Sequence, residues 1–448
     1  MRSTLIRQAF LVGGLVLAAA AAWAAEPLQV GEVYPITIDS TGRVGLVGTP
    51  TPSGRIWELH HPDATYLALH FSRFELAPGD QLFVSDPQGK QRQAVSDRGT
   101  AEDYTFWSRH VKGDSLVLEL VSTTLASGAP RSAFRVEEYA AGFVPLGGGV
   151  EAICGADDKK NVRCYAETHP TEYGRARAVA RLLIQGRYLC TGWLVSSDSL
   201  LLTNEHCINS SREALNTDYE FGAEATTCGS ANCQLCYPGT VYDGQELIRY
   251  SSALDYSLIR LAGAPASSWG YLEIDDRVAR LDEEIYMPQH PAGYAKQFGI
   301  VDTSETDGVC RVATITAPAC TGAAYNDVSY SCDTEGGSSG SPVIARSSHK
   351  VIALHHCGYE AGCFNTGVPI TLVYDEIAPY LSPCVPQTEV CTDSVDNDCD
   401  GFVDCDDDDC DGHPACPAEC GQTGEPCVVN AECCSLKCVG KPGKKVCK

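Results

Sequence analysis

The sequence predicts a mainly β protein of several domains. Apolar and polar residues alternate along short segments, for example at residues 66–71 and 116–121, and Gly- and Pro-rich turns separate these segments. This period of two is typical of half-buried strands. Helical periodicity is sparse except near residues 373–378. The chain has 448 residues, which is too many for one hydrophobic core, so several domains are expected.

A signal peptide is predicted at residues 1–24. Two arginines precede an apolar run from Phe10 to Ala22, and Ala22-Trp23-Ala24 has the small-x-small pattern of a cleavage site. The run is too short for a membrane-spanning helix. We therefore expect a secreted chain without a membrane span, cleaved near Ala24.

Charge and cysteine content exclude several function classes. The formal net charge of −25 argues against nucleic acid as a partner, because a phosphate backbone requires a basic protein face. It also argues against an anionic membrane surface. The 24 cysteines all follow residue 153, and this density in an exported chain indicates disulfides.

Residues 25–149 contain no cysteine and show the alternation of an antiparallel β-sandwich or jelly roll. They contain no catalytic constellation. Two roles are open for this segment: a pro-region that is removed on maturation, or an accessory domain that is retained. Gly147-Gly148-Gly149 is predicted as a flexible hinge at its end.

Three stretches downstream carry residue types that acyl-transfer chemistry needs. Ser339 lies in a Gly/Ser-rich turn before the apolar run 343–345, and such a turn exposes a hydroxyl beside backbone donors. His206 follows the apolar run 200–202, and Asp255 precedes another apolar segment. The order His, Asp, Ser is that of the chymotrypsin arrangement.

These motifs resemble the trypsin-like serine peptidase family. Thr203-Asn204-Glu205-His206-Cys207, Cys190-Thr191-Gly192-Trp193 and the G-x-S-G-S-P pattern around Ser339 are most similar to the bacterial secreted branch of lysyl and glutamyl endopeptidases. For residues 150–383 the resemblance implies a chymotrypsin-like double β-barrel closed by a short helix. It also implies a Cys190–Cys207 disulfide. No cofactor is implied for catalysis.

The resemblance assigns a role to each residue of the predicted triad. Ser339 attacks the scissile carbonyl, His206 transfers the proton, and Asp255 orients the imidazole. The backbone N–H groups of Gly337 and Ser339 are expected to form the oxyanion hole. Ser338 replaces the aspartate that pairs with a freed N-terminus in digestive trypsins, so activation by that ion pair is not expected.

The substrate pocket is predicted to involve Asp333, Thr334, His355, His356 and Gly358. Asp333 lies where trypsins carry the carboxylate that selects Arg or Lys. Thr334 and the histidine pair instead match residues that bind an acidic side chain in glutamyl endopeptidases. The pattern slightly favours the acidic preference, and a structural role for Asp333 as a loop cap stays open. Gly358 would offer backbone contacts to the peptide.

Further cysteines are expected to brace the peptidase domain. Cys332 is predicted to pair with Cys357 or Cys363. Cys154 and Cys164 would join the start of the domain to later loops. The spacing of Cys228, Cys233 and Cys236 resembles that of a zinc knuckle, but a loop closed by a disulfide is favoured in an exported protein.

Residues 384–416 contain two Asp-rich repeats that resemble the first half of a calcium loop, with oxygen ligands on alternate residues and a glycine for the turn. A disulfide-stapled acidic linker is the alternative. The predicted structural Ca²⁺ ligands are Asp396, Asp398, Asp400, Asp407, Asp409 and Asp411.

Residues 417–448 form a small cysteine-rich module whose spacing resembles a knottin. A domain of this size depends on its disulfides because it lacks a sufficient core. The knottin order implies the pairs Cys420–Cys434, Cys427–Cys438 and Cys433–Cys447.

Two functions follow from these observations. The first is a secreted serine endopeptidase that acts on protein or peptide substrates through an acyl-enzyme. The alternative is a catalytically silent adhesion or binding protein, in which the two C-terminal modules bind a surface or polymer.

Overall fold

The computed structural model of the chain describes residues 26–41, 44–100, 104–122, 132–144, 152–153, 155–305, 307–359, 363–381, 388–392, 408–410, 413, 438–441 and 444–447. The predicted signal peptide and the predicted glycine hinge lie outside these residues. None of the described helices is long and apolar enough to cross a membrane.

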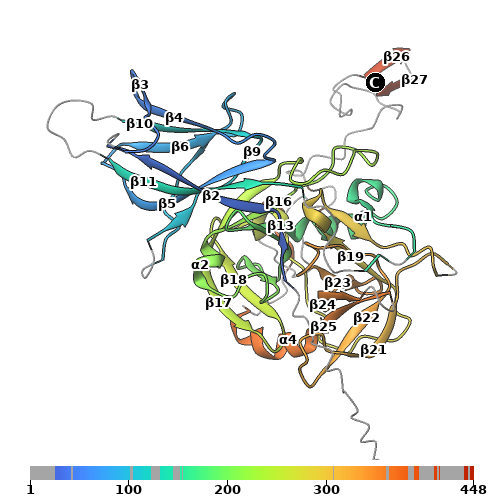
Figure 1. Cartoon of the computed structure of the whole chain (residues 1–448). Helices are drawn as coiled ribbons and strands as arrows, with labels where there is room; N and C mark the ends of the chain where they lie inside the picture. The colour runs from blue at the N-terminus through green and yellow to red at the C-terminus, as the bar shows by residue number, and fades with distance from the viewer. Residues whose placement is uncertain are drawn as a thin grey trace, which may run out of the picture.

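Residues 31–142 form a β-sandwich, as the sequence predicts (Figure 1). Large aromatic side chains such as Trp57, Phe71 and Phe134 fill the space between its two sheets and are almost fully buried. One sheet has the order β3 (Thr49–Thr51), β4 (Gly54–His60), β10 (Ser115–Val121), β6 (Gln81–Ser85) and β7 (Gln93–Ala94). The other contains β2 (Gly31–Asp39), β11 (Ala133–Gly142), β5 (Tyr66–Glu75) and β8 (Phe106–Trp107), with β9 (Val111–Lys112) also paired to β5.

The first barrel of the predicted peptidase domain is closed by backbone pairing. Its strands follow the order β14 (Tyr188–Leu194), β13 (Val179–Ile184), β16 (Thr217–Phe221), β17 (Thr240–Ser251), β18 (Tyr256–Leu261) and β15 (Leu200–Thr203). β15 pairs back onto β14 and closes the ring. One further strand, β1 (Leu28–Gln29), adds to the edge of β14, so the N-terminal segment takes part in this barrel.

The second barrel is built from a second antiparallel sheet. Its order is β12 (Lys160–Asn161), β20 (Gln297–Gly299), β19 (Ile285–Gln289), β23 (Pro342–Ala345), β24 (Val351–Tyr359), β25 (Phe364–Pro369), β22 (Asn326–Tyr330) and β21 (Val312–Pro318). Hydrogen bonds from Ile285 N to Cys310 O and from Val312 N to Glu283 O, both 3.0 Å long, join the start of β21 to the start of β19. The predicted double-barrel architecture is confirmed.

The described helices are short, and all but η6 belong to the region of the two barrels. They are η1 (Val162–Cys164), α1 (Pro170–Arg175), η2 (Ala176–Ala178), α2 (Ser211–Leu215), α3 (Ala266–Trp269), η3 (Pro291–Gly293), α4 (Ile370–Ile377), η4 (Ala378–Tyr380) and η6 (Asp408–Cys410). α4 is the helix expected at the end of the domain. Its Glu376 accepts hydrogen bonds from Arg249 and Tyr256, both 2.8 Å long, which fasten the helix to the first barrel.

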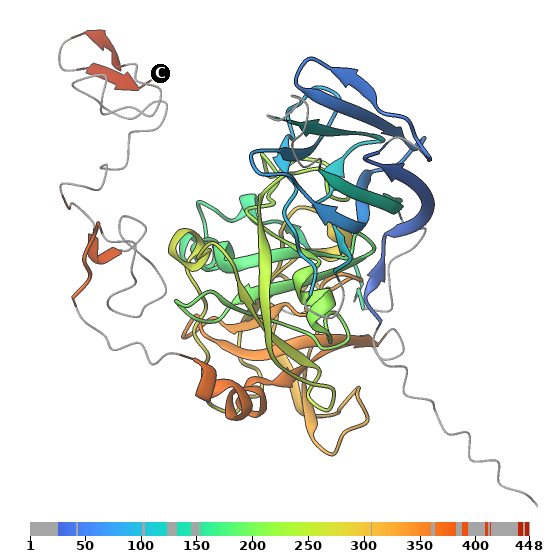
Figure 2. The same cartoon turned by 90° about the vertical axis from the view of Figure 1, so that its left-hand side faces the viewer.

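The β-sandwich lies against the first barrel (Figures 1 and 2), and buried ion pairs attach it there. Arg98 lies 2.9 Å from Asp218, and Nδ1 of His110 lies 2.7 Å from the other carboxylate oxygen. Lys112 pairs with Glu220 of the same strand, β16, at 3.0 Å. Because a buried charge without a partner is costly, these contacts bind the two parts tightly.

The described disulfides confirm some cysteine predictions and correct another. Cys190 bonds to Cys207, Cys164 to Cys228, Cys233 to Cys236, Cys320 to Cys357, and Cys391 to Cys410. The expected bond from Cys332 to Cys357 or Cys363 is wrong. Cys332 lies in the core of the second barrel beside Cys310, and neither forms a disulfide within the described part of the chain.

Most of the C-terminal predictions lie outside the described residues. Among the predicted calcium ligands only Asp409 is described, and it is exposed. β26 (Cys438–Lys441) and β27 (Lys444–Cys447) form an antiparallel pair. The knottin pairing and the calcium site stay predictions.

We predict that Asp218 stabilises the attached sandwich in a pH-dependent way. Burial opposes its ionisation, but Arg98 and His110 outweigh burial and lower the pKa of Asp218 to about 2. A lowered pKa contributes stability that is present above about pH 4 and is lost as the pH falls toward about 2. Asp218→Asn should therefore cost about 3–5 kcal/mol at pH 7, measured by denaturant unfolding.

The difference from the unmodified protein should shrink as the pH falls from about 4 to about 2, because Asp218 of the unmodified protein then becomes neutral, as the asparagine of the variant is at every pH. Asp276→Asn, at an exposed aspartate, is the matched control. A constant difference across this range would contradict the prediction.

Candidate active site

Thr191 of β14 fixes the turn that carries Ser339. Its N–H donates to the carbonyl of Ser339 and its hydroxyl to the carbonyl of Gly337, each at 2.8 Å. The carbonyl of Gly336 accepts the N–H of Ala292 at 2.7 Å. These bonds hold the turn by its carbonyl groups, as expected if its N–H groups are to serve an oxyanion.

Two glycines are required in this turn for steric reasons. Gly337 and Gly340 have φ angles of 98° and 88°, in the left-handed region that favours glycine. A Cβ at Gly340 would lie 2.1 Å from the carbonyl oxygen of Thr191 and 2.5 Å from the hydroxyl of Thr203. The nucleophile turn thus packs directly on β14 and on the segment that leads to His206.

His206 is held by a disulfide and by Asp255. It follows β15, and the neighbouring Cys207 is bonded to Cys190 of β14. Nδ1 of His206 lies 2.8 Å from Oδ2 of Asp255, and its backbone N–H donates to Oδ1 at 3.0 Å. The structure thus brings His206 against Asp255 as predicted and anchors Ser339 to the residue that follows Cys190.

Asp255 occupies a strained position that its neighbours stabilise. Its φ angle is 45°, which costs about 1–3 kcal/mol for a residue with a side chain. The side chain of Asn204 donates to the carbonyl of Asp255 at 2.9 Å. Together with the two contacts to His206, this bond fixes the carboxylate just before β18.

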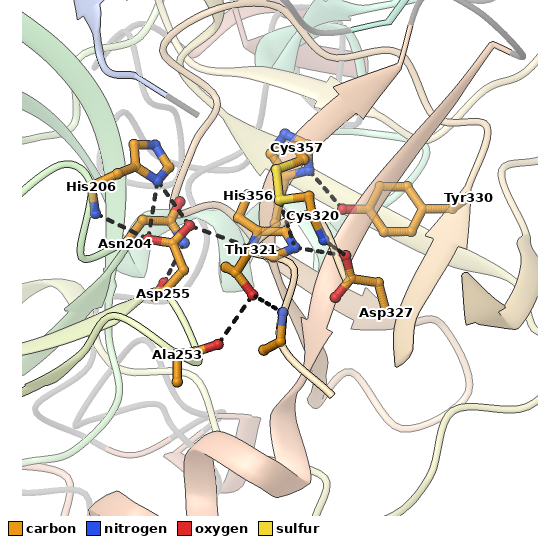
Figure 3. The surroundings of a disulfide bond; sticks show 12 residues. Asn204, His206, Ala253, Asp255, Cys320, Thr321, Asp327, Tyr330, His356 and Cys357 are labelled. Carbon is orange, nitrogen blue, oxygen red and sulfur yellow. Dashed lines mark hydrogen bonds and ion pairs between the residues drawn. A yellow bond between two sulfur atoms is a disulfide. The ribbon is translucent and has the colours of Figure 1, made fainter. Parts of the chain in front are cut away.

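His356 lies behind Asp255, on the side opposite His206 (Figure 3). Its Nδ1 is 3.3 Å from Oδ2 of Asp255, an ion-pair contact whose geometry falls short of a hydrogen bond. Its Nε2 is 2.9 Å from Oδ2 of Asp327, which is fully buried. The assignment of His356 to the substrate pocket is therefore corrected, because both ring nitrogens already face carboxylates inside the protein.

Asp255, His356 and Asp327 form a row of buried side chains in which each charge stabilises the opposite charge next to it. Burial favours the neutral ring of His356, but Asp255 and Asp327 outweigh it and raise the pKa of His356 to about 9. Burial likewise opposes ionisation of Asp255, yet His206 and His356 hold the pKa of Asp255 well below its usual range. At neutral pH, Asp255 is thus an anion and His356 a cation.

The Cys320–Cys357 disulfide supports this row from the second barrel (Figure 3). The N–H of Cys320 donates to Asp327 at 3.2 Å, and the hydroxyl of Thr321 donates to the carbonyl of Ala253 at 3.2 Å. Sequence reasoning missed Asp327. Its only signal is a carboxylate in a predominantly buried strand, which is too weak to identify it.

Comparison with known proteins places the chain in a family. Residues 156–369 match the lysyl endopeptidase C-terminal domain. Secreted RxLR effector protein 73 of Plasmopara viticola is 34% identical over 320 residues, which cover 68% of this chain and 77% of that protein. The chain is therefore related to that effector over about two thirds of its length, and its residues 156–369 belong to the lysyl endopeptidase C-terminal domain family.

Other matches are named as endopeptidases. A lysyl endopeptidase of Pseudomonas aeruginosa is 24% identical over 401 residues, which cover 80% of this chain and 82% of that enzyme. The solved structure of a Glu endopeptidase in complex with MPD is 20% identical, with a TM-score of 0.36 over 51% of this chain and 98% of that chain.

The other predicted pocket residues lie in one region of the second barrel. Asp333 is buried, and one of its oxygens accepts the N–H of Asp158 at 2.7 Å. Thr334 donates to the side chain of Asn365 at 2.7 Å. His355 is fully buried with Nδ1 2.7 Å from the hydroxyl of Tyr330.

Gly358 lies on β24, where it pairs with Asn365 of β25. The contacts given above for Asp333, Thr334 and His355 are made within the chain, and the roles of these residues toward a substrate stay predictions. So does the role of the Gly337 and Ser339 N–H groups as an oxyanion hole.

We predict that His356 makes the stability of this protein depend on alkaline pH. Because its pKa is raised to about 9, its contribution is present below about pH 6.5 and is lost as the pH rises through about 9. The free energy of unfolding of the unmodified protein should fall across that range, and His356→Gln should remove this dependence. Denaturant unfolding between pH 6 and pH 10 measures it.

His60→Gln, which changes an exposed histidine of the sandwich, is the matched control and should keep the pH dependence. An equal slope in the His356 variant and in the control would mean that another group binds the proton.

Proposed function

We propose that the protein is a secreted serine endopeptidase that hydrolyses peptide bonds through Ser339, His206 and Asp255. The observation that carries the proposal is the contact of His206 with Asp255 at 2.8 Å beside a nucleophile turn anchored on Thr191. This arrangement joins a base, its orienting carboxylate and a serine in a tight glycine turn. The names of its relatives support both proteolysis and secretion.

In the proposed reaction, Ser339 attacks the carbonyl carbon of the scissile bond, and His206 accepts the proton of the hydroxyl. His206 then donates that proton to the leaving amine, and an acyl-enzyme remains on Ser339. Water, deprotonated by the same imidazole, hydrolyses the ester. Asp255 stabilises the imidazolium, and the N–H groups of Gly337 and Ser339 stabilise the oxyanion.

The charge row behind the triad fits this mechanism. Cationic His356 neutralises one of the two buried carboxylates and keeps Asp255 ionised, so Asp255 can stabilise a second imidazolium on its other side. We regard His356, Asp327 and Asn204 as positioning residues, because the groups they contact are Asp255 and its immediate supports.

We propose an acidic side chain at the substrate position before the scissile bond. Asp333 could select a basic side chain, as the names of the lysyl endopeptidase relatives suggest, but its carboxylate is buried and already accepts a backbone N–H. His355 can instead supply a donor or a positive charge to a carboxylate.

The nucleophile can be tested with a fluorophosphonate probe on the purified full chain. The unmodified protein should be labelled, and Ser339→Ala should lose labelling together with about 10⁴-fold or more of kcat/KM on peptides. Ser347→Ala, at an exposed serine, is the control and should retain both. A folded, unlabelled parent protein would favour the alternative of a silent binding protein.

Digestion of a peptide library should reveal cleavage after Asp and Glu. Cleavage after Lys and Arg that is lost in Asp333→Asn would assign the pocket to Asp333 instead.

The digest should give the same preference in the presence of a calcium chelator, because the predicted Ca²⁺ ligands belong to the separate Asp-rich repeats. A changed preference under chelation would place a metal near the catalytic domain.

A further inference from the structure

Three segments share one edge of β14. β13 pairs with the other edge from Tyr188 to Trp193. On the shared edge, β1 pairs with residues 188–189, the nucleophile turn bonds to Thr191, and β15 pairs with residues 193–194. The N-terminal segment of the chain and the candidate nucleophile are therefore neighbours on the same strand.

The spacing between them is small. Residues in a strand are about 3.3 Å apart, so Leu189, the partner of Leu28, is only about 7 Å from Thr191, the partner of Ser339. β1 runs antiparallel to β14, with Leu28 opposite Leu189 and Gln29 opposite Tyr188. Residues that precede Leu28 therefore lead toward Cys190 and the catalytic turn.

This edge lies on the leaving-group side of the site. Cys190 is bonded to Cys207, the neighbour of His206, and His206 is the group that would protonate the leaving amine. A peptide in extended form adds to an exposed strand edge through its backbone. The residues that follow a scissile bond would thus pair with β14 at positions 188–189, where β1 now lies.

The N-terminal segment is held there firmly. The N–H groups of Val30 and Gly31 both donate to the carbonyl of Arg187, at 2.7 and 3.1 Å. Val30 is fully buried in a cluster that includes Leu189 and Leu235. Because β2 follows immediately, the sandwich and its ion pairs to β16 determine where the segment lies.

We propose that residues 26–29 are an intramolecular competitor of the substrate, seated on the leaving-group side of the peptide groove. The proposal rests on the proposed peptidase function. A protein substrate must displace β1 before its residues beyond the scissile bond can pair with β14. A small substrate without such residues does not meet this competition. Pro27, which has a fixed φ and no N–H, stiffens the segment where it approaches the catalytic turn.

The test compares two substrates that share the same residues before the scissile bond. One is a peptide with three residues after that bond, and the other is a p-nitroanilide. Leu28→Gly/Gln29→Gly should weaken β1, because glycine destabilises a strand and removes the packing of Leu28. KM for the longer peptide should fall about tenfold, and kinetics on the p-nitroanilide should not change.

A deletion of residues 26–29 should have the same or a larger effect. Val44→Gly/Val47→Gly, which changes exposed residues of the sandwich, is the matched control and should leave both substrates unaffected. The rate of fluorophosphonate labelling reports that each variant is folded.

Equal kinetics of the variants and the parent on the longer peptide would overturn the proposal, as would parallel changes on both substrates. Failure of the peptidase function is distinct, because the parent would then hydrolyse neither substrate and would not be labelled.

Discussion

The carboxylate of Asp255 is the constraint on which the relation between the two barrels depends. It belongs to the first barrel, yet it contacts His206 on one side and the cationic His356 of the second barrel on the other. Leaving a buried carboxylate without a partner costs several kcal/mol. The two barrels therefore keep the relative position that brings His356 to Asp255, and the same position presents the Ser339 turn to Thr191.

Sequence patterns predicted the fold class and singled out His206 and Ser339, because both predictions depend on local signals. Alternation marks strands, and the motifs around His206 and Ser339 are contiguous. The role of His356 was wrong for a geometric reason. The pairing of β24 with β25 shifts register between His355 and Cys357, so His356 is the extra residue of a β-bulge; His355 contacts Tyr330 and His356 contacts Asp255. The strand register within the barrel decides which residues the two histidines contact, and no contiguous sequence motif encodes that register.

Disulfides show the same limit. Cys332 and Cys357 are near each other in sequence and flank the nucleophile, which suggested a bond between them. In the structure, Cys357 of β24 meets Cys320, which precedes β22, whereas Cys332 turns into the core beside Cys310. The strand order of the closed sheet therefore decides which cysteines form disulfides. The Cys190–Cys207 bond, which the family resemblance implied, joins β14 to the loop that follows its consecutive and paired strand β15.

The attachment of the β-sandwich bears on whether it is a pro-region or a retained domain. It buries Asp218 and Glu220 of β16 against its own cations, and it covers the edge of β14 with β1. Its removal would return these carboxylates to water and leave an unpaired strand edge, which binds other chains readily. The edge leads to the candidate nucleophile, so the chain that replaces β1 there would be a substrate. The same contact thus bears both on the choice between a pro-region and a retained domain and on the competition proposed for residues 26–29.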